Sequence, residues 1–221
     1  MIKIGYSNKF TYIMGVGILW SAYSLVVAPA PLPDTLLLIG VMFFLTDLIS
    51  GLLHVILDNP RSLDIDAIRG LAEGFQRHHE DPTNIYRMPL YEHLYVMHLP
   101  LTLMFFILLP FHEPRMYVVF LTAVVSLHVM QMAHLWAHAP AARVPKVVRR
   151  LQKFKLLLGK AQHGRHHRPP YNKNFCILTG MCNPLLNSAV AVIGHTTHWW
   201  NAVFLVVAVA PLMLAFLLST S

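Results

Sequence analysis

Residues 35–57 read TLLLIGVMFFLTDLISGLLHVIL and carry a single charged side chain, that of Asp47. An α-helix needs about 20 consecutive apolar residues to cross the hydrocarbon core of a bilayer. This stretch therefore predicts a transmembrane helix that holds two ionisable residues, Asp47 and His54. Because such residues are costly inside a membrane, they are candidates for function wherever they occur.

Three further uncharged stretches are long enough to cross a membrane: residues 10–28, 94–111 and 116–138. A fifth, residues 199–218, is equally apolar, although Pro211 interrupts it. The chain is 56% hydrophobic and only 12% charged, whereas about 25% of residues are charged in soluble domains. The sequence thus excludes an ordinary soluble enzyme. It predicts an all-α fold, in which residues 1–221 form one membrane domain, a multi-pass bundle of four or five transmembrane helices.

The first stretch has an alternative interpretation as a cleaved secretory signal. Lys3 and Lys9 precede it, and Ala28-Pro29-Ala30 loosely resembles a cleavage site. The uncharged run is long for a signal, so a retained transmembrane helix is the favoured interpretation.

Lysine and arginine are distributed unevenly between the loops. Residues 29–34 contain none, residues 58–92 contain four arginines, and residues 139–187 contain ten basic residues. Basic loops are retained on the cytoplasmic side of a membrane. Both long loops should therefore lie on the cytoplasmic face of a bacterial inner membrane or of the endoplasmic reticulum.

The same face is expected to collect eight of the 14 histidines, as a histidine-rich cap on the bundle. Two helix ends contribute three of them, and the two long loops contribute the motifs HH and HGRHH. The eight candidate metal ligands and catalytic residues are His54, His78, His79, His134, His138, His163, His166 and His167.

The number of these histidines and the residues around them indicate which metal ions they would bind. Imidazole suits zinc, copper, iron and nickel, and one zinc takes about four ligands, so eight histidines favour two metal ions. An intramembrane zinc protease would show H-E-x-x-H, whereas residues 134–138 read HLWAH and offer no glutamate as a general base. Two histidine-held irons that activate dioxygen against C–H bonds are the favoured hypothesis.

Other polar residues are candidates for supporting roles. Asp47 is expected to orient a ligating histidine, with a structural hydrogen bond to a neighbouring helix as the alternative. His128 is expected to be structural, and Cys176 and Cys182 are expected to be buried thiols. Residues that would add ligands or support them are Asp58, Glu92, Gln131, His93 and His98.

Residues 146–158 alternate apolar and basic side chains at helical spacing. A basic amphipathic helix of this kind lies on anionic lipid headgroups, and the expected headgroup contacts are Lys146, Arg149, Arg150 and Lys153. A solvated helix docked on the rest of the protein is the alternative. Nucleic acid is an unfavourable partner, because the basic stretch adjoins membrane helices and carries no recognised binding motif.

The order and spacing of these motifs resemble the Kua family of lipid desaturases, the family of plasmanylethanolamine desaturase. The resemblance covers about residues 40–187. It rests on DLISGLLH at 47–54, HHEDPTNIYR at 78–87, Q-x-x-H-x-x-x-H at 131–138, H-x-x-H-H at 163–167 and PYNKNFC at 170–176. After residue 186 the chain departs from the family pattern and stays uncharged through His195 and His198.

The resemblance implies a di-iron centre on the eight histidines, with dioxygen as co-substrate. It also implies a phospholipid substrate and a separate electron donor, either cytochrome b5-like or ferredoxin-like. The leading hypothesis is vinyl-ether (plasmalogen) formation from an alkyl-ether phospholipid, and the alternative is an acyl-lipid desaturase or hydroxylase of the same class. A non-enzymatic metal carrier or sensor is a remote alternative, because no hydropathy repeat is visible and the histidines crowd one interface.

Overall fold

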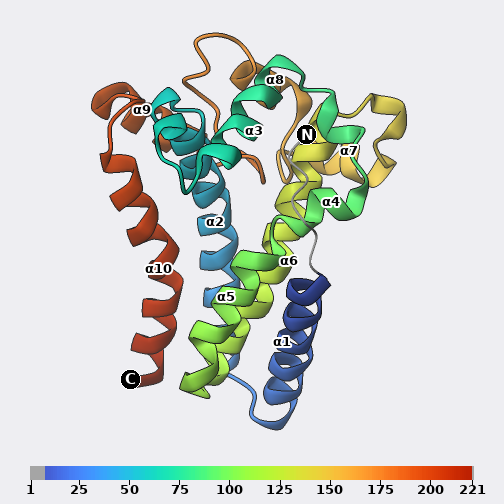
Figure 1. The fold of residues 1–221 in the computed structure, drawn as a ribbon. Coiled ribbons are helices and arrows are strands. Elements are labelled where there is room, and N and C mark those ends of the chain that lie inside the picture. The colour runs from blue at the N-terminus through green and yellow to red at the C-terminus, as the bar shows by residue number, and fades with distance from the viewer. Residues whose placement is uncertain (1–7, 221) are drawn as a thin grey trace. The chain divides into compact units, whose positions relative to one another are not determined.

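The computed structural model describes residues 8–220, and every regular element in that range is helical. The longest helices are α1 (Asn8–Val27), α2 (Leu32–Leu57), α6 (Pro114–His138) and α10 (Trp199–Thr220) (Figure 1). The shorter α-helices are α3 (Arg69–Glu80), α4 (Leu90–Tyr95), α5 (His98–Leu108), α7 (Lys146–Lys153), α8 (Lys160–His166) and α9 (Asn183–Ile193). Single 3-10 turns are η1 (Pro60–Asp64), η2 (Asn84–Tyr86), η3 (Leu109–Phe111) and η4 (Ala141–Arg143). The predicted all-α class is confirmed.

Five segments of the described chain are long and apolar enough to cross a membrane. The third of them begins earlier than expected, because α4, α5 and η3 together form one apolar segment, Leu90–Phe111. The fifth is α10, which continues through Pro211 as a helix. Its side chains at Leu205 and Val206 are exposed, as expected of a helix that faces lipid.

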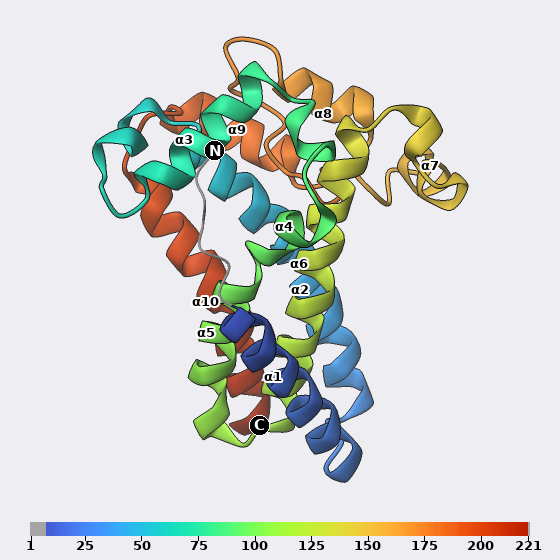
Figure 2. The ribbon, with the colours of Figure 1, turned by 45° about the vertical axis from the view of Figure 1, so that its right-hand side comes forward.

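The chain forms two compact units. Unit 1 comprises Met1–Thr46, Leu90–His128 and Val207–Ser221, and unit 2 comprises Asp47–Pro89 and Val129–Val206. Unit 1 has an apolar core in which Leu101 and Phe120 are completely buried. Within it α1 packs against α5 (Figure 2).

In unit 1, Gly17 permits the close approach of α1 and α5, because a Cβ atom there would lie 2.8 Å from the ring of Phe105. The charged side chains at the start of α6 form ion pairs. Arg115 binds Asp34 at 2.7 Å and Glu113 at 2.8 Å, which neutralises the charges at the start of α6.

Unit 2 is organised around the C-terminal half of α2, with α3, α8 and α9 gathered at its end (Figures 1 and 2). The completely buried carboxylate of Asp47 holds a distant loop against this helix. Its Oδ1 accepts hydrogen bonds from the backbone N–H groups of Thr179 at 2.8 Å and Gly180 at 3.0 Å, and its Oδ2 accepts one from Cys182 at 3.0 Å. Three charge-assisted bonds offset the cost of burying the carboxylate.

The next turn of α2 extends the same attachment. The Ser50 hydroxyl accepts a hydrogen bond from the Ile177 N–H at 3.0 Å. Gly51 lets the loop approach, because a Cβ atom there would lie 2.5 Å from Sγ of Cys176. Cys176 and Cys182 are both buried free thiols, as predicted, and burial raises the pKa of Cys182 to about 12.

Helix α7 is shorter than the amphipathic segment expected from the sequence. The predicted headgroup contacts on it, Lys146, Arg149, Arg150 and Lys153, are all exposed. The apolar side chains of Val147 and Phe154 are also exposed, whereas Val148 is buried. A basic surface with exposed apolar side chains is compatible with a lipid surface, and contact of α7 with headgroups remains a prediction.

The Asp47→Asn variant should unfold at a markedly lower temperature in detergent. The amide keeps one acceptor oxygen but turns an NH2 group toward backbone N–H donors, which leaves buried donors unpaired at a cost of about 3 kcal/mol. Thermal unfolding of Asp47→Asn and of the exposed control Asp66→Asn measures this effect. Equal midpoints for the two variants would show that the loop does not depend on Asp47.

Single cysteines at Asp66 and Lys155 should be labelled from the cytoplasmic side, and one at Pro31 from the opposite side, because the basic loops stay inside. All three positions are exposed, whereas the native thiols are buried and should give little background. Accessibility to a membrane-impermeant maleimide is the measurement. Labelling of Asp66 and Lys155 from opposite sides would contradict a shared histidine-rich face.

Candidate metal centre

Helical geometry sorts seven of the eight histidines into two groups within unit 2. Successive residues on an α-helix point about 100° apart, whereas residues four apart share a face. The neighbours His78 and His79 at the end of α3 therefore point to different places. On α8 and just after it, His163 and His167 share a face, and His166 points elsewhere. On α6, His134 and His138 share a face.

The first group, here the five-histidine group, consists of His78, His134, His138, His163 and His167. Nε2 of His138 lies 3.0 Å from Nε2 of His78 and 3.2 Å from that of His134. It also lies 2.8 Å from Nε2 of His163, which in turn is 3.1 Å from Nε2 of His167.

These contacts cannot all be hydrogen bonds. A ring nitrogen of a neutral imidazole is either one donor or one acceptor, yet Nε2 of His138 faces three others. A cation shared by the lone pairs satisfies every member at once. Nitrogen atoms 2.8 to 3.2 Å apart are close enough to bind one metal ion together.

The second group, here the Asp58 group, consists of Asp58, His79 and His166. The Nε2 atoms of the two histidines are 3.1 Å apart. Asp58 places Oδ1 3.6 Å from Nε2 of His79 and Oδ2 3.3 Å from Nε2 of His166, and neither oxygen has a hydrogen-bond partner. A buried carboxylate without hydrogen bonds is costly, and a metal ion would supply what it lacks.

His54 lies beside both groups. Its ring centroid is 5.8 Å from that of His134 and 5.3 Å from that of His166. Its Nδ1 is 2.9 Å from the carbonyl oxygen of Ser50, and Nδ1 of His166 is likewise 3.1 Å from that of Lys173. Such bonds to the second nitrogen orient an imidazole and leave Nε2 available to a metal.

The structure adds His195, to which the sequence had assigned no role. It lies near enough to Asp58, His79 and His166, the whole Asp58 group, for a charge on its ring to affect all three, and its buried Nε2 has no hydrogen-bond partner. Its ring is 5.5 Å from that of Phe175, which packs 5.3 Å from His166. In the sequence, the one feature that could have marked His195 as part of the site is its position just before the last apolar helix.

Burial keeps the loop histidines neutral, which is the form that binds metal. Burial is the largest cause in each case, and neighbouring imidazoles add to it. The pKa of His166 falls to about 4 and that of His167 to about 2, and the pKa values of His78, His79 and His163 also fall. Burial raises the pKa of Asp58, while nearby histidines oppose this shift.

The residues expected to support the histidines lie in different places. Asp47 does not orient a histidine through a direct bond, because its oxygens accept backbone N–H groups instead. Gln131 lies half-buried on α6. Glu92 and His93 belong to unit 1 and to neither group.

Two histidines of unit 1 have structural partners. Nδ1 of His98 bonds the Thr11 hydroxyl at 2.8 Å, and Nδ1 of His128 bonds the Val124 carbonyl at 2.7 Å. The structural role expected of His128 is thus supported by its hydrogen bond, and His98 has a hydrogen-bonding role as well.

Comparison with known proteins assigns this chain to a family. A family model described as the lipid desaturase domain matches residues 43–208, which include the five-histidine group and the Asp58 group. This protein belongs to the lipid desaturase family. The match continues past residue 187 and includes His195.

Curated relatives in this family include fatty acid desaturase 4, chloroplastic, of Arabidopsis thaliana, which is 32% identical over 151 residues, 66% of this chain and 46% of the relative. Plasmanylethanolamine desaturase of Myxococcus xanthus is 28% identical over 148 residues, 64% of this chain and 52% of the relative. The chain thus spans about half the length of these relatives. No solved structure matches it significantly.

Proposed function

We propose that this member of the lipid desaturase family is a membrane-embedded di-iron enzyme that desaturates a phospholipid chain near its head group. The observation that carries the proposal is the convergence of the five-histidine group on Nε2 of His138, next to the Asp58 group. Two adjoining sets of neutral nitrogen ligands suit a pair of metal ions better than one.

The first iron would be held by the five-histidine group, and the second by Asp58, His79 and His166, with His54 and His195 beside them. When bound, the irons supply the activation of dioxygen that removal of hydrogen from an unactivated C–H bond requires. The overall reaction converts –CH2–CH2– to –CH=CH– and reduces one O2 to two H2O, consuming two electrons and two protons from outside the substrate.

The residues of the chain hold, orient and shield this site. The carbonyl groups of Ser50 and Lys173 fix the rings of His54 and His166. His54, His163 and His166 are almost completely buried, which limits the access of water. Since these side chains all lie in unit 2, their positions follow from the fold of that unit alone.

The depth of the site bears on the substrate. His54 is three residues from the end of α2, and His138 is the last residue of α6. At about 1.5 Å per residue, both lie within one turn of the helix ends, so reach is limited to carbons close to the lipid head group. This favours the ether-linked C1–C2 bond of an alkyl-ether phospholipid, or a proximal acyl bond, over mid-chain positions.

Between these two substrates we propose vinyl-ether (plasmalogen) formation, with acyl-chain desaturation or hydroxylation as the alternative. The names of the relatives support both, one being a plasmanylethanolamine desaturase and another a fatty acid desaturase. The two electrons would come from a separate donor of the cytochrome b5 or ferredoxin type. The site would face the cytoplasm of a bacterial cell, or the cytosolic side of the endoplasmic reticulum.

The purified protein should contain close to two irons per chain. Removal of Nε2 of His138 takes away the atom on which the five-histidine group converges, so His138→Ala should retain at most about one iron. His128→Ala on the same helix is the matched control and should keep both. Elemental analysis after detergent extraction is the measurement, and one zinc per chain without iron in active protein would contradict the di-iron assignment.

Cells that express the protein and receive an alkyl-ether lipid precursor should form an acid-labile vinyl-ether phospholipid in air and none under nitrogen. His79→Ala and His167→Ala should each reduce the product more than about 100-fold while the protein still enters the membrane. Lipid analysis before and after acid treatment measures the product. An acid-stable product unsaturated deep in an acyl chain would favour the alternative, and full activity of both variants would refute the metal site.

A further inference from the structure

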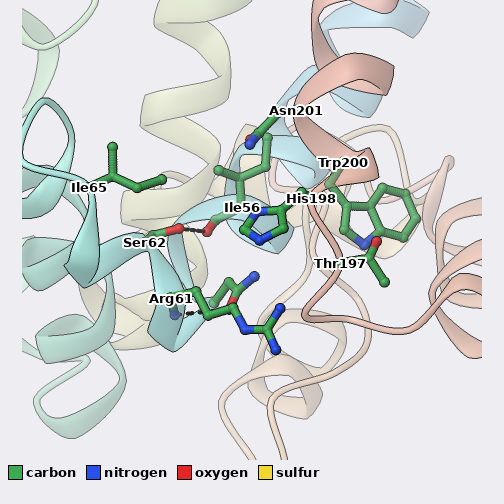
Figure 3. A pocket seen from close by; sticks show the side chains of 9 residues that line it. Ile56, Arg61, Ser62, Ile65, Thr197, His198, Trp200 and Asn201 are labelled. Carbon is green, nitrogen blue, oxygen red and sulfur yellow. Dashed lines mark hydrogen bonds between the residues drawn. The ribbon is translucent and has the colours of Figure 1, made fainter.

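A polar hollow lies between the end of α2, the η1 turn and the start of α10, and Asn59, which follows Asp58 in the chain, lines it. Its inner part is lined by Ile56, Asn59, Arg61, Ser62, Ile65, Thr197, His198, Trp200 and Asn201 (Figure 3). It continues into an open groove of about 670 Å³ lined by Arg61, Thr196, Thr197, His198 and Trp199. All of these residues belong to unit 2, and none carries a negative charge.

The guanidinium of Arg61 has few partners within the protein. Its exposed guanidinium makes one hydrogen bond, from Nη1 to the carbonyl oxygen of Thr196 at 3.3 Å. No ion pair joins Arg61 to a carboxylate among residues 8–220. The remaining N–H donors of the guanidinium are therefore available to an anion. The planar arrangement of these donors fits the oxygen atoms of a phosphate.

The opposite wall of the hollow also favours an anion. His198 and Asn201 present exposed polar side chains there, and the buried Oγ1 of Thr197 has no hydrogen-bond partner. Figure 3 shows these residues arranged around the hollow together with Arg61. The 22-residue helix α10 begins at Trp199, so its positive dipole end lies at the same place.

The groove also lies at the depth of lipid head groups. Trp199 is the first residue of a helix that is long and apolar enough to cross a membrane, and its side chain is 72% exposed. Tryptophan at such a position marks the boundary between hydrocarbon and water. The apolar side chains of Ile65 and Trp199 beside the charge suit the glycerol and upper chain of a lipid better than a free anion.

We propose that this groove binds the phosphate group of a membrane phospholipid, with Arg61 as its main contact and His198 and Asn201 as further donors. The proposal rests on the proposed function and deepens it, because the bound lipid would be the substrate. Arg61 is three residues from Asp58, so their Cα atoms are within about 11 Å of each other. A phosphate held by Arg61 would therefore place the first carbons of the chain beside the Asp58 group.

The test uses iron-depleted full-length protein in a neutral detergent, so that binding is measured without turnover. The probes are a dihexanoyl phosphatidylethanolamine, the matching dihexanoylglycerol without phosphate, and inorganic phosphate alone, each followed by isothermal titration calorimetry. The wild type should bind the phospholipid at least about tenfold more tightly than the glyceride. Arg61→Gln should remove this difference, and Arg69→Gln should keep it.

Arg69 is the matched control, since it loses the same charge eight residues away but is paired with Asp66 outside the groove. His198→Ala and Asn201→Ala should each weaken phospholipid binding, and they serve if Arg61→Gln does not fold. Unchanged phospholipid binding in the groove variants would overturn the proposal. Binding of inorganic phosphate as tight as that of the phospholipid would overturn it too, because the groove would then be a free-phosphate site.

The same variants test the groove and the proposed desaturase function independently. Phosphate-dependent lipid binding that needs Arg61, in cells that form no desaturated lipid, would leave the groove intact and refute the proposed function. Lipid desaturation by Arg61→Gln with the wild-type KM would refute the groove and leave the proposed function intact.

Discussion

The buried carboxylate of Asp47 is the interaction on which unit 2 depends. In a low-dielectric interior a charge is tolerated only where hydrogen bonds replace the lost water, and Asp47 obtains three from the backbone of residues 179–182. Ser50 and Gly51 continue the same face of α2 and bring Ile177 and Cys176 against it. One helix face thus determines where a loop more than a hundred residues away must lie.

The position of this loop explains how the histidines meet. The segment that Asp47 holds is continuous with Lys173, whose carbonyl oxygen lies 3.1 Å from Nδ1 of His166. His54 lies about two turns beyond Asp47 on the same helix, and Asp58 follows directly after the end of that helix, about three turns beyond Asp47. The attachment therefore brings α8 to the end of α2, where His166 and Asp58 form one group. Asp47 thus anchors the loop from within α2, while Asp58, just past the end of the same helix, faces the two histidines.

The two histidine groups have more ligand atoms than hydrogen bonds can satisfy, which supports the proposed metal ions. Nε2 atoms that crowd around His138 exceed the number of hydrogen bonds that one imidazole nitrogen can make, and Asp58 is buried without any. Membership of the lipid desaturase family is consistent with this surplus of ligands. The proposed groove at Arg61 likewise has polar groups without a partner in the protein. Its positive charge and remaining N–H donors would bind a lipid phosphate.

The amino-acid sequence by itself determined the class of fold, the apolar spans and the identity of the eight histidines, because hydropathy and helical spacing are local properties of the chain. It also separated His134 and His138 from a zinc-protease motif. It could not assign Asp47, since a carboxylate in a span is equally suited to a histidine and to a backbone amide. Only the tertiary structure decided that Asp47 binds the loop, that Asp58 joins His79 and His166, and that His195 lies near them. These contacts join residues far apart in the chain, and their partners are selected by packing rather than by spacing.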